Sequence, residues 1–286
     1  MVKCNVCFRG CEIGEGKTGF CGARKCKNGI IKADNYGRLT ALALDPVEKK
    51  PLSMFYPGSK IVSVGSYGCN LRCPFCQNSD ISWSDYALSC RDETNYLSPE
   101  DLVEIALNHR NRGNIGIAFT YNEPLIGYEY VRDTAKLAHE AGLKNVLVTN
   151  GTASPEVLEE LKPYIDAMNI DLKGFTDHYY NDVLKGSRSM VMDFIKEAAK
   201  FCHVELTTLI VPGENDGEEE MREISSWVAG LGDVYDGKSG RDIPLHITRF
   251  FPRFHMQDRN ATDVRLIYGL VETAREKLDY VFPGNC

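Results

Sequence analysis

The stretch KIVSVGSYGCNLRCPFCQN, residues 60–78, joins a predicted strand to a tight group of cysteines. Residues 60–66 are rich in β-branched side chains, which favours a strand buried on both faces. Cys69, Cys73 and Cys76 follow with the spacing C-x3-C-x2-C, and thiolates this close favour a shared metal centre. Three thiolates can hold a [4Fe–4S] cluster by three of its irons, which leaves the fourth iron open to a small molecule. A zinc site with a distant fourth ligand is the alternative interpretation.

The composition is that of an ordinary globular chain and argues against several classes of function. The 286 residues carry a formal net charge of −7, so we expect no binding of nucleic acid or of an anionic membrane. The opening MVKCNVCFRG lacks the apolar run of a signal peptide, and no apolar run approaches the roughly 18 residues that span a bilayer. We therefore expect a cytoplasmic protein whose 11 cysteines do not form a disulfide framework.

The chain beyond residue 58 predicts alternating strands and helices. Six strand-then-helix units begin at Lys60, and such a series requires right-handed crossovers and a parallel sheet. Six units make an open, partial β/α barrel, because closure takes eight. The predicted fold class is therefore α/β, with a cysteine-rich N-terminal extension. The predicted strands are 60–66, 114–120, 145–150, 167–172, 203–211 and 243–248, and the predicted helices are 98–110, 127–142, 154–163, 189–202, 216–232 and 262–278.

Polar residues follow the predicted strands, where a barrel of this kind places its active site. The carboxyl ends of parallel strands gather at one rim, so we expect these side chains to lie close together. They are the three cysteines after the first strand, TYNEP (120–124), TNG (149–151), DLK (171–173), VPGEND (211–216) and His246 in the last strand.

Residues 1–58 differ from the rest of the chain. They carry five cysteines and only short apolar runs, so a bound metal could supply stability that a small core lacks. Four thiolates complete a tetrahedral site with no open position, and either structural zinc or a second [4Fe–4S] cluster suits such a site. Free thiols in a flexible tail are the third interpretation. The four expected ligands are Cys4, Cys7, Cys11 and Cys21.

These patterns divide the chain into three parts. They are a metal-binding segment 1–58, a barrel core 59–255, and a closing helix and tail 256–286. Two cysteines outside the clusters have their own interpretation. Cys202 ends a helical stretch and is expected to be a small buried residue. Cys26 is expected to face solvent near the first cluster, and a spare ligand of that cluster is the alternative.

The C-x3-C-x2-C loop after a first barrel strand resembles the signature of the radical SAM superfamily. The resemblance implies that the amino and carboxylate groups of S-adenosylmethionine chelate the open iron of a [4Fe–4S] cluster. One electron from the cluster would cleave the sulfonium to methionine and a 5′-deoxyadenosyl radical, which abstracts a hydrogen atom. Cys69, Cys73 and Cys76 are then the catalytic, cluster-binding residues.

The same resemblance implies cofactor contacts along the rim. Phe75 would pack near the adenine, and Asn78 would lie in the loop that covers the cluster. YNEP stands where the family has GGEP, so Glu123 would face the ammonium while Asn122 takes a glycine position. This departure leaves the backbone contact of that motif open, although a carboxylate can still accept a charge-assisted hydrogen bond.

Residues at three further predicted strands also match the superfamily. Thr149 and Asn150 would form hydrogen bonds with the cofactor. Asp171 and Lys173 resemble the DLK of glycyl-radical activating enzymes; Lys173 would pair with the cofactor carboxylate, while Asp171 could contact the ribose, bind a cation or fix Lys173. His246 resembles a late-strand histidine near the ribose in those enzymes, and an ordinary half-buried histidine is the alternative.

Segments along nearly the whole chain resemble the radical SAM enzyme of the AmmeMemoRadiSam system, a family similar to pyruvate formate-lyase activating enzyme. They are CNVCFRGCEIGEGKTGFCGAR (4–24), YGRLTALALDPVEKKPLSMFYPG (36–58), GCNLRCPFCQN (68–78), FTYNEP (119–124) and VFPGN (281–285). Met54 departs from the family, whose members tend to have a histidine there.

The closer resemblance implies an activating-enzyme-like oxidoreductase. Its substrate would be a glycine or side chain of a partner protein, and flavodoxin or ferredoxin would be the electron donor. A radical enzyme that acts on a small molecule is the alternative. Candidate substrate-binding residues for that alternative are Tyr121, Tyr128, Arg249, Arg253 and His255.

Overall fold

The computed structural model describes residues 1–286 and is built around one eight-stranded sheet. One edge strand runs antiparallel to its neighbour, and the other seven strands are parallel. The two edge strands do not pair with each other, so the predicted open, partial β/α barrel is confirmed. In spatial order the strands are β14 (Val281–Gly284), β13 (Leu245–Arg249), β12 (His203–Ile210), β11 (Ala167–Asp171), β10 (Lys144–Thr149), β9 (Asn114–Phe119), β7 (Lys60–Gly65) and the antiparallel β6 (Ala41–Pro46).

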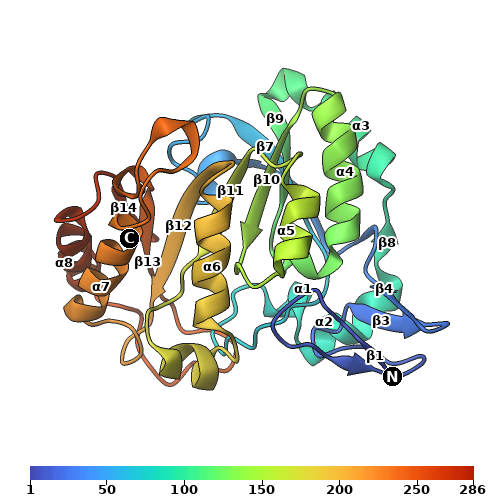
Figure 1. The fold of residues 1–286 in the computed structure, drawn as a ribbon, viewed down its shortest axis with the longest axis horizontal. Helices are drawn as coiled ribbons and strands as arrows, with labels where there is room; N and C mark the ends of the chain where they lie inside the picture. The colour runs from blue at the N-terminus through green and yellow to red at the C-terminus, as the bar shows by residue number, and fades with distance from the viewer.

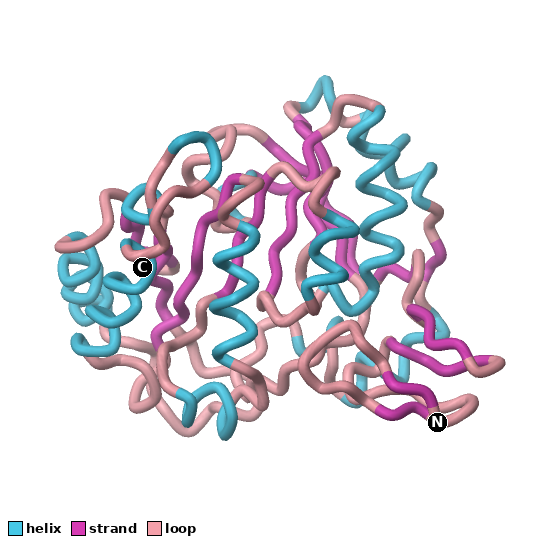
Figure 2. The backbone as a smooth tube through the Cα atoms, in the orientation of Figure 1, coloured by secondary structure: helices cyan, strands magenta, loops and turns pink.

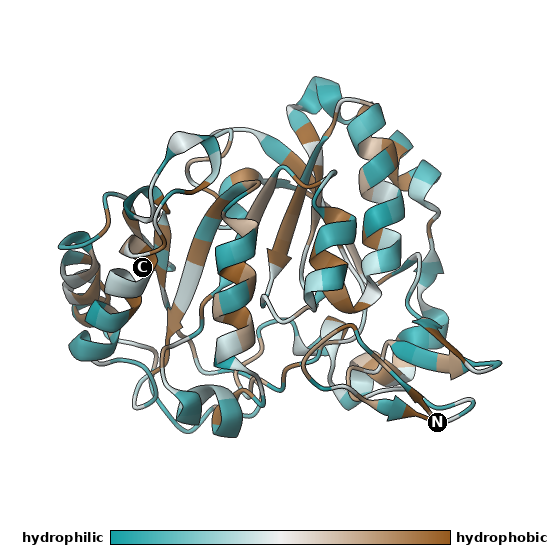
Figure 3. Ribbon diagram, viewed as in Figure 1, coloured by the Kyte–Doolittle hydropathy of each residue, from teal (hydrophilic) through white to brown (hydrophobic).

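Six helices alternate with the strands and pack on the outer side of the curved sheet (Figure 1). Their exposed faces are hydrophilic, whereas the strands beneath them are largely hydrophobic (Figure 3). A capping box starts the first of these helices, because Ser98 and Asp101 each accept the other's backbone N–H. Gly142, just after the second helix, adopts the left-handed conformation typical of a helix end. The helices are α3 (Pro99–Asn108), α4 (Tyr128–Glu140), α5 (Pro155–Leu161), α6 (Arg188–Ala198), α7 (Glu218–Ala229) and α8 (Val264–Arg275).

The sequence did not predict the two edge strands. β14 contains Pro283 and Gly284, which are poor strand formers, but proline is tolerated at a sheet edge. β6 is an apolar run that owes its conformation to pairing with β7. These strands belong to the predicted N-terminal and C-terminal parts, so both parts contribute to the central sheet. The three-part division of the chain stays a prediction.

Residues 47–55, which we call the floor segment, close the amino ends of the strands. Glu205 of β12 fixes this segment, because its carboxylate accepts the backbone N–H groups of Ser53 at 2.9 Å and Met54 at 2.8 Å. The same carboxylate meets Nε2 of His203 at 2.9 Å and Nε2 of His246 at 2.7 Å. The floor segment adds an apolar cluster under the sheet, made of Val47, Leu52 and Phe55 with Ile61, Ala118, Val146 and Ala167.

The N-terminal lobe, residues 1–34, lies at the carboxyl ends of the strands. It consists mostly of loops and two short hairpins (Figure 2), which are β1 (Val2–Lys3) with β2 (Glu12–Ile13) and β3 (Arg24–Lys27) with β4 (Ile30–Ala33). The Val6 carbonyl accepts the N–H of Ser154 at 2.8 Å, and Cys7 forms a β-bridge with Ala153. These contacts attach the lobe to the loop after β10.

None of the helices is both long and apolar enough to cross a membrane.

The buried carboxylate of Glu205 makes stability depend on pH. Burial alone would raise the pKa of Glu205, but hydrogen bonds from His203, His246 and the backbone of Met54 lower it to about 2. Because this pKa lies below the 4.5 of an unperturbed glutamate, the stabilisation is complete above pH 4.5 and is lost as the pH falls toward 2. We therefore expect Glu205→Gln to lower the free energy of unfolding by about 3 kcal/mol at pH 7, and by much less at pH 3.

Urea denaturation of both proteins at the two pH values measures this difference. Glu272→Gln is the matched control, because Glu272 is exposed and pairs only with Arg275. This control should change stability by less than about 0.5 kcal/mol. An equal loss for Glu205→Gln at both pH values would contradict the role of the ionised carboxylate.

Candidate active site

The three cysteines lie on the loop between β7 and the short helix α1 (Ser79–Ser82), packed against the N-terminal lobe. The N–H of Cys69 donates to the Cys21 carbonyl at 3.1 Å. Gly68 precedes it with a φ of +98°, and a Cβ at this position would lie 2.7 Å from the Cβ of Ala23 and 2.9 Å from the Cys21 oxygen. Only glycine therefore fits where the lobe meets the loop.

The surroundings of these sulfurs suit metal-bound thiolates. Sγ of Cys69 accepts the N–H of Leu71 at 3.4 Å and lies 3.9 Å from Nδ2 of Asn150. Burial raises the pKa of the Cys69 thiol, and it raises the pKa of the Cys73 thiol to about 11. Both thiols therefore need a nearby cation, such as a metal ion, to become thiolates at neutral pH. No three His, Cys, Asp or Glu side chains stand as a ready metal site. The fit of a cluster therefore rests on the three thiols and their N–H donors.

Glu123 joins the ends of β9 and β10 beside Cys69. Its carboxylate accepts the Thr149 hydroxyl at 2.7 Å and the backbone N–H groups of Asn150 and Leu125 at 2.8 and 3.0 Å. Burial raises the pKa of Glu123 to about 7, against the opposing effect of these hydrogen bonds. The structure thus brings together Glu123, Thr149, Asn150 and Cys69, as expected for a shared rim.

Asn122 and Asn78 hold the cysteine loop to the turn after β9. Oδ1 of Asn122 accepts the Ser66 N–H at 3.0 Å, and its Nδ2 donates to the Gly68 carbonyl at 3.2 Å. Nδ2 of Asn78 donates to the Tyr121 carbonyl at 2.9 Å. These side-chain amides position the backbone of the loop, and the predicted contacts of Asn122 and Asn78 with a cofactor stay predictions.

Asp171 and Lys173 form an ion pair at the end of β11. Nζ of Lys173 lies 2.7 Å from Oδ2 of Asp171, and the backbone N–H of Lys173 donates to the Tyr180 hydroxyl at 3.0 Å. Burial would lower the pKa of Lys173, but Asp171 and the nearby Cys73 raise it. Of the three roles weighed for Asp171, the fixing of Lys173 is the one with a contact in the structure.

His246 lies in the barrel interior but turns away from the rim. It pairs in register with Thr207, which pairs with Asp171, so the three residues are level on neighbouring strands. Its imidazole instead contacts Glu205, two residues nearer the amino end of β12, and stacks on Phe282. The predicted contact of His246 with the ribose stays a prediction.

The segment 249–255 covers the cysteine loop. The ring of Phe75 meets Phe250 edge to face, with centroids 6.2 Å apart. The N–H of His255 donates to the Pro74 carbonyl at 2.8 Å. Arg249 is committed to the Thr262 carbonyl at 2.7 Å. Phe75 and His255 are therefore near the cysteines, although the structure gives neither a substrate contact.

Two tyrosines proposed as substrate contacts lie in different places. Tyr128 is on α4, where its hydroxyl faces Glu160 at 3.5 Å, away from the cysteines. Tyr121 packs on Gly65, and its hydroxyl donates to Asp45 at 2.8 Å, next to the buried Lys50. Of the two tyrosines, only Tyr121 thus contacts the Lys50–Asp45 ion pair beside the strands.

Sequence reasoning missed the polar groups beneath the rim. His203, Glu205 and Thr207 alternate along β12, and this period of two could have revealed that they share one face. The pair of Lys50 with Asp45 at 2.9 Å had no comparable signal. This ion pair forms because the floor segment turns back from β6, and no local sequence pattern predicts that turn.

The four N-terminal cysteines line one small cavity together with Arg9 and Arg24. The N–H of Cys4 donates to the Cys11 carbonyl at 2.8 Å, which closes the hairpin that carries the first three cysteines. Cys26 does not face solvent as expected: it is 1% exposed, because the β3–β4 hairpin folds it inward. Cys202 is buried as expected, and its thiol donates to the Ala198 carbonyl.

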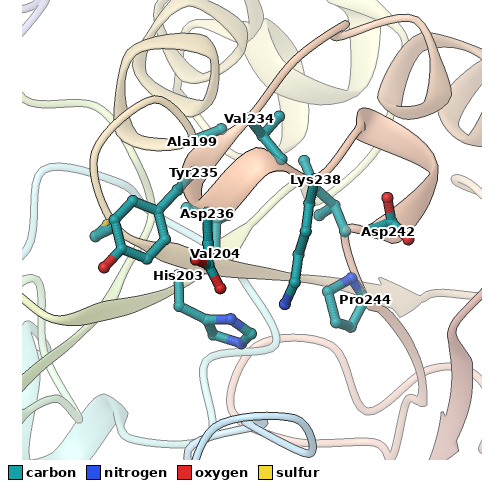
Figure 4. A pocket seen from close by; sticks show the side chains of 11 residues that line it. Ala199, His203, Val204, Val234, Tyr235, Asp236, Lys238, Asp242 and Pro244 are labelled. Atoms are coloured by element: carbon teal, nitrogen blue, oxygen red, sulfur yellow. The ribbon is translucent and has the colours of Figure 1, made fainter.

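A separate hollow lies at the amino ends of β12 and β13 (Figure 4). Its volume is about 50 Å³, and its walls include His203, Tyr235, Lys238 and Asp242. Parallel sheets of this kind bind ligands at the carboxyl ends of their strands. This hollow therefore lies at the end of the barrel opposite to the cysteine loop, and we assign it no part in the site.

Comparison with known proteins identifies the family to which this geometry belongs. A family model described as "Radical SAM superfamily" matches residues 63–224. An uncharacterised protein of Methanocaldococcus jannaschii is 40% identical over 288 residues, which cover 99% of this chain and 81% of that protein. The pyruvate formate-lyase 1-activating enzyme of Escherichia coli (strain K12) is 25% identical over 184 residues, which cover 62% of this chain and 72% of that enzyme.

A solved structure shows the same fold. It is a domain of pyruvate-formate lyase-activating enzyme from Bacteroides vulgatus ATCC 8482, with a TM-score of 0.51 and 15% identity over 59% of this chain and 99% of that one. The chain belongs to the radical SAM superfamily. It is thus an enzyme of radical SAM chemistry, and membership implies a [4Fe–4S] cluster and S-adenosylmethionine.

The crowding at Gly68 yields a test of the cysteine loop. Gly68→Ala forces a Cβ against the lobe and should cost about 3 kcal/mol of stability, with most of the bound iron lost, because the loop can no longer pack. Gly58→Ala is the matched control: Gly58 also has a positive φ, +81°, but no atom lies within 4 Å of its Cβ position. It should cost about 1 kcal/mol and keep its iron. Thermal unfolding and iron analysis after anaerobic reconstitution measure both effects; equal iron in the two variants would contradict the packing.

Proposed function

We propose that the chain is an activating-enzyme-like oxidoreductase that removes a hydrogen atom from a glycine or a side chain of a partner protein. The observation that carries this proposal is the loop with Cys69, Cys73 and Cys76 but no fourth thiol, beside Glu123 and Lys173 at the carboxyl rim. Cys69, Cys73 and Cys76 would hold a [4Fe–4S] cluster, which would supply one electron for cleavage of the sulfonium of bound S-adenosylmethionine. The side chains of the rim would bind and orient the cofactor.

The carboxylate and the ammonium of the cofactor would each meet a complementary charged group at the rim. Lys173 would pair with the cofactor carboxylate. The ammonium of Lys173 is held in place by Asp171, whose Oδ2 lies 2.7 Å from it. Glu123 would face the ammonium of the cofactor, whose charge favours ionisation of this buried carboxyl. Phe75 would pack near the adenine, and Thr149 and Asn150 would complete the hydrogen bonds. A contact of His246 with the ribose would require its imidazole to leave Glu205, which it meets at 2.7 Å.

The open barrel supports a protein substrate. β6 and β14 are both edge strands and do not pair, from which we infer a lateral gap in the barrel wall. A loop of a partner protein needs such a gap to reach the rim, whereas a closed wall would admit only small molecules. The relative of similar sequence from Escherichia coli is named for activating pyruvate formate-lyase, which agrees with this class of substrate.

A small-molecule substrate is the second candidate, and one observation favours it. Lys50 is 3% exposed and pairs with Asp45 beside the Tyr121 hydroxyl. A buried ammonium near an aromatic hydroxyl could bind the carboxylate or phosphate of a small substrate. Arg253 is a further candidate under this alternative.

We also propose that Cys4, Cys7, Cys11 and Cys21 hold one structural zinc ion. Their cavity measures about 10 Å³, which suits a single ion, and four thiolates leave no position open. A second [4Fe–4S] cluster is the alternative. An acidic low-potential carrier, flavodoxin or ferredoxin, would supply the electron for the catalytic cluster.

The central proposal predicts a simple product. Reconstituted, dithionite-reduced protein should convert S-adenosylmethionine to 5′-deoxyadenosine and methionine, measured anaerobically by mass spectrometry. Cys73→Ala should abolish both products, because one iron of the cluster loses its ligand. Cys202→Ala, a change of another buried cysteine, is the control and should keep the activity. Persistent 5′-deoxyadenosine from Cys73→Ala would rule out the proposed cluster.

Deuterium transfer separates the two substrate classes. A partner protein deuterated at its glycines should pass deuterium to 5′-deoxyadenosine if the substrate is a glycine. An unlabelled partner protein in deuterated solvent should pass none. Lys50→Met would leave this transfer unchanged for a protein substrate. No transfer from the labelled partner protein, with cofactor cleavage retained, would favour the small-molecule alternative.

The N-terminal metal predicts a second measurement. The double variant Cys4→Ser, Cys7→Ser should lose one zinc per chain while keeping about four irons, as measured by plasma emission analysis. Cys26→Ser, a change of a buried cysteine outside the cavity, is the control and should keep the zinc. A loss of about four irons without loss of zinc would show a second cluster instead.

A further inference from the structure

The N-terminal lobe differs in charge from the rest of the molecule. Its residues 1–34 carry seven Lys and Arg and only three Asp and Glu, a net charge of +4. The remaining residues carry 26 basic and 37 acidic side chains, a net charge of −11. A basic lobe on an acidic protein attracts an acidic partner to one place.

An aromatic ring stands at the junction of this lobe with the cysteine loop. Phe20 is 40% exposed, and two guanidinium groups flank it: that of Arg9 lies 3.4 Å and that of Arg72 3.9 Å from the ring centroid. Arg9 is anchored to the Asn70 carbonyl at 2.7 Å and to the Lys185 carbonyl. The result is a fixed patch of one aromatic ring between cations, which we call the Phe20 patch.

The patch is connected to the cluster-binding loop by short steps. Arg72 donates to the Phe20 carbonyl at 2.5 Å and to the Cys69 carbonyl at 2.8 Å. Cys21, the next residue after Phe20, accepts the N–H of Cys69 at 3.1 Å. One hydrogen bond therefore separates the residue next to an exposed ring from a cysteine that would bind the catalytic cluster.

From this geometry we propose that the Phe20 patch is the docking site of an acidic flavoprotein that carries single electrons, and that the electron enters through Phe20, Cys21 and Cys69. The proposal rests on the proposed function, which requires one electron per cleavage. The exposed edge of the Phe20 ring suits the edge of a flavin, and the two guanidinium groups that flank the ring suit a surface of carboxylates. The flavin loses one electron, the [4Fe–4S] cluster gains it, and no bond forms or breaks.

Binding of a purified flavodoxin to the reconstituted protein tests the proposal. Titration calorimetry under anaerobic conditions should show binding at about 0.05 M salt that weakens at least about tenfold at about 0.3 M. Charge reversal at two exposed lysines of this region, Lys17→Glu with Lys185→Glu, should weaken binding about tenfold at low salt. Arg265→Glu with Lys277→Glu on the far side of the molecule makes the same change in net charge and should leave binding unchanged.

A second readout separates docking from catalysis. Dithionite reduces the cluster without docking, so both double variants should form 5′-deoxyadenosine with dithionite at the rate of the parent protein. With flavodoxin as donor, only Lys17→Glu with Lys185→Glu should be slower. If no protein forms 5′-deoxyadenosine with dithionite, the proposed function fails while the binding result still stands. Equal binding by the two double variants, or binding of an acidic ferredoxin with none of flavodoxin, would overturn the proposed docking site.

Discussion

The arrangement of the site depends on the contact between the N-terminal lobe and the start of the cysteine loop. The Cys21 carbonyl accepts the N–H of Cys69, and Gly68 lacks the Cβ that would collide with Ala23. From the other side, the Gly68 carbonyl accepts Nδ2 of Asn122. The loop is therefore fixed between two segments distant in sequence. Because the N–H of Cys69 donates to the Cys21 carbonyl, a displacement of the lobe at Cys21 would also displace the cysteine loop.

Two buried carboxylates hold the rim and the floor of the barrel, and their partners give them opposite properties. Burial raises the pKa of Glu123 to about 7, because its donors are backbone N–H groups and a hydroxyl with no cation among them. Glu205 has two imidazole partners, which lower its pKa to about 2 despite burial. Glu205 is thus a permanent charge that fixes the floor segment, whereas Glu123 can respond to the charge of what binds beside it. An ammonium bound beside Glu123 would favour its ionised form.

The parts of the structure that local pattern encodes were predictable, and those set by distant pairing were not. The six central strands, the Ser98 capping box and the gathering of Glu123, Asn150 and Cys69 at one rim follow from periodicity and from the rule for parallel sheets. β6 and β14 were missed because each becomes a strand only by pairing with a neighbour. The burial of Cys26 and the contact of Glu205 with the floor segment depend on tertiary packing in the same way. The cysteine spacing could specify a ligand set but not the orientation of His246, which the nearby Glu205 determines.

The position of the lobe also bears on the route by which an electron would reach the proposed cluster. The lobe attaches to the loop after β10, near the middle of the sheet, through Ser154 and Ala153. The unpaired edge strands β6 and β14 lie at the two ends of the sheet. The Phe20 patch meets the loop after β7, the neighbour of β6, so a donor on the patch would lie directly over the cysteine loop. Because residues 35–286 carry a net charge of −11, a donor rich in carboxylates would favour the basic lobe over the remainder of the surface.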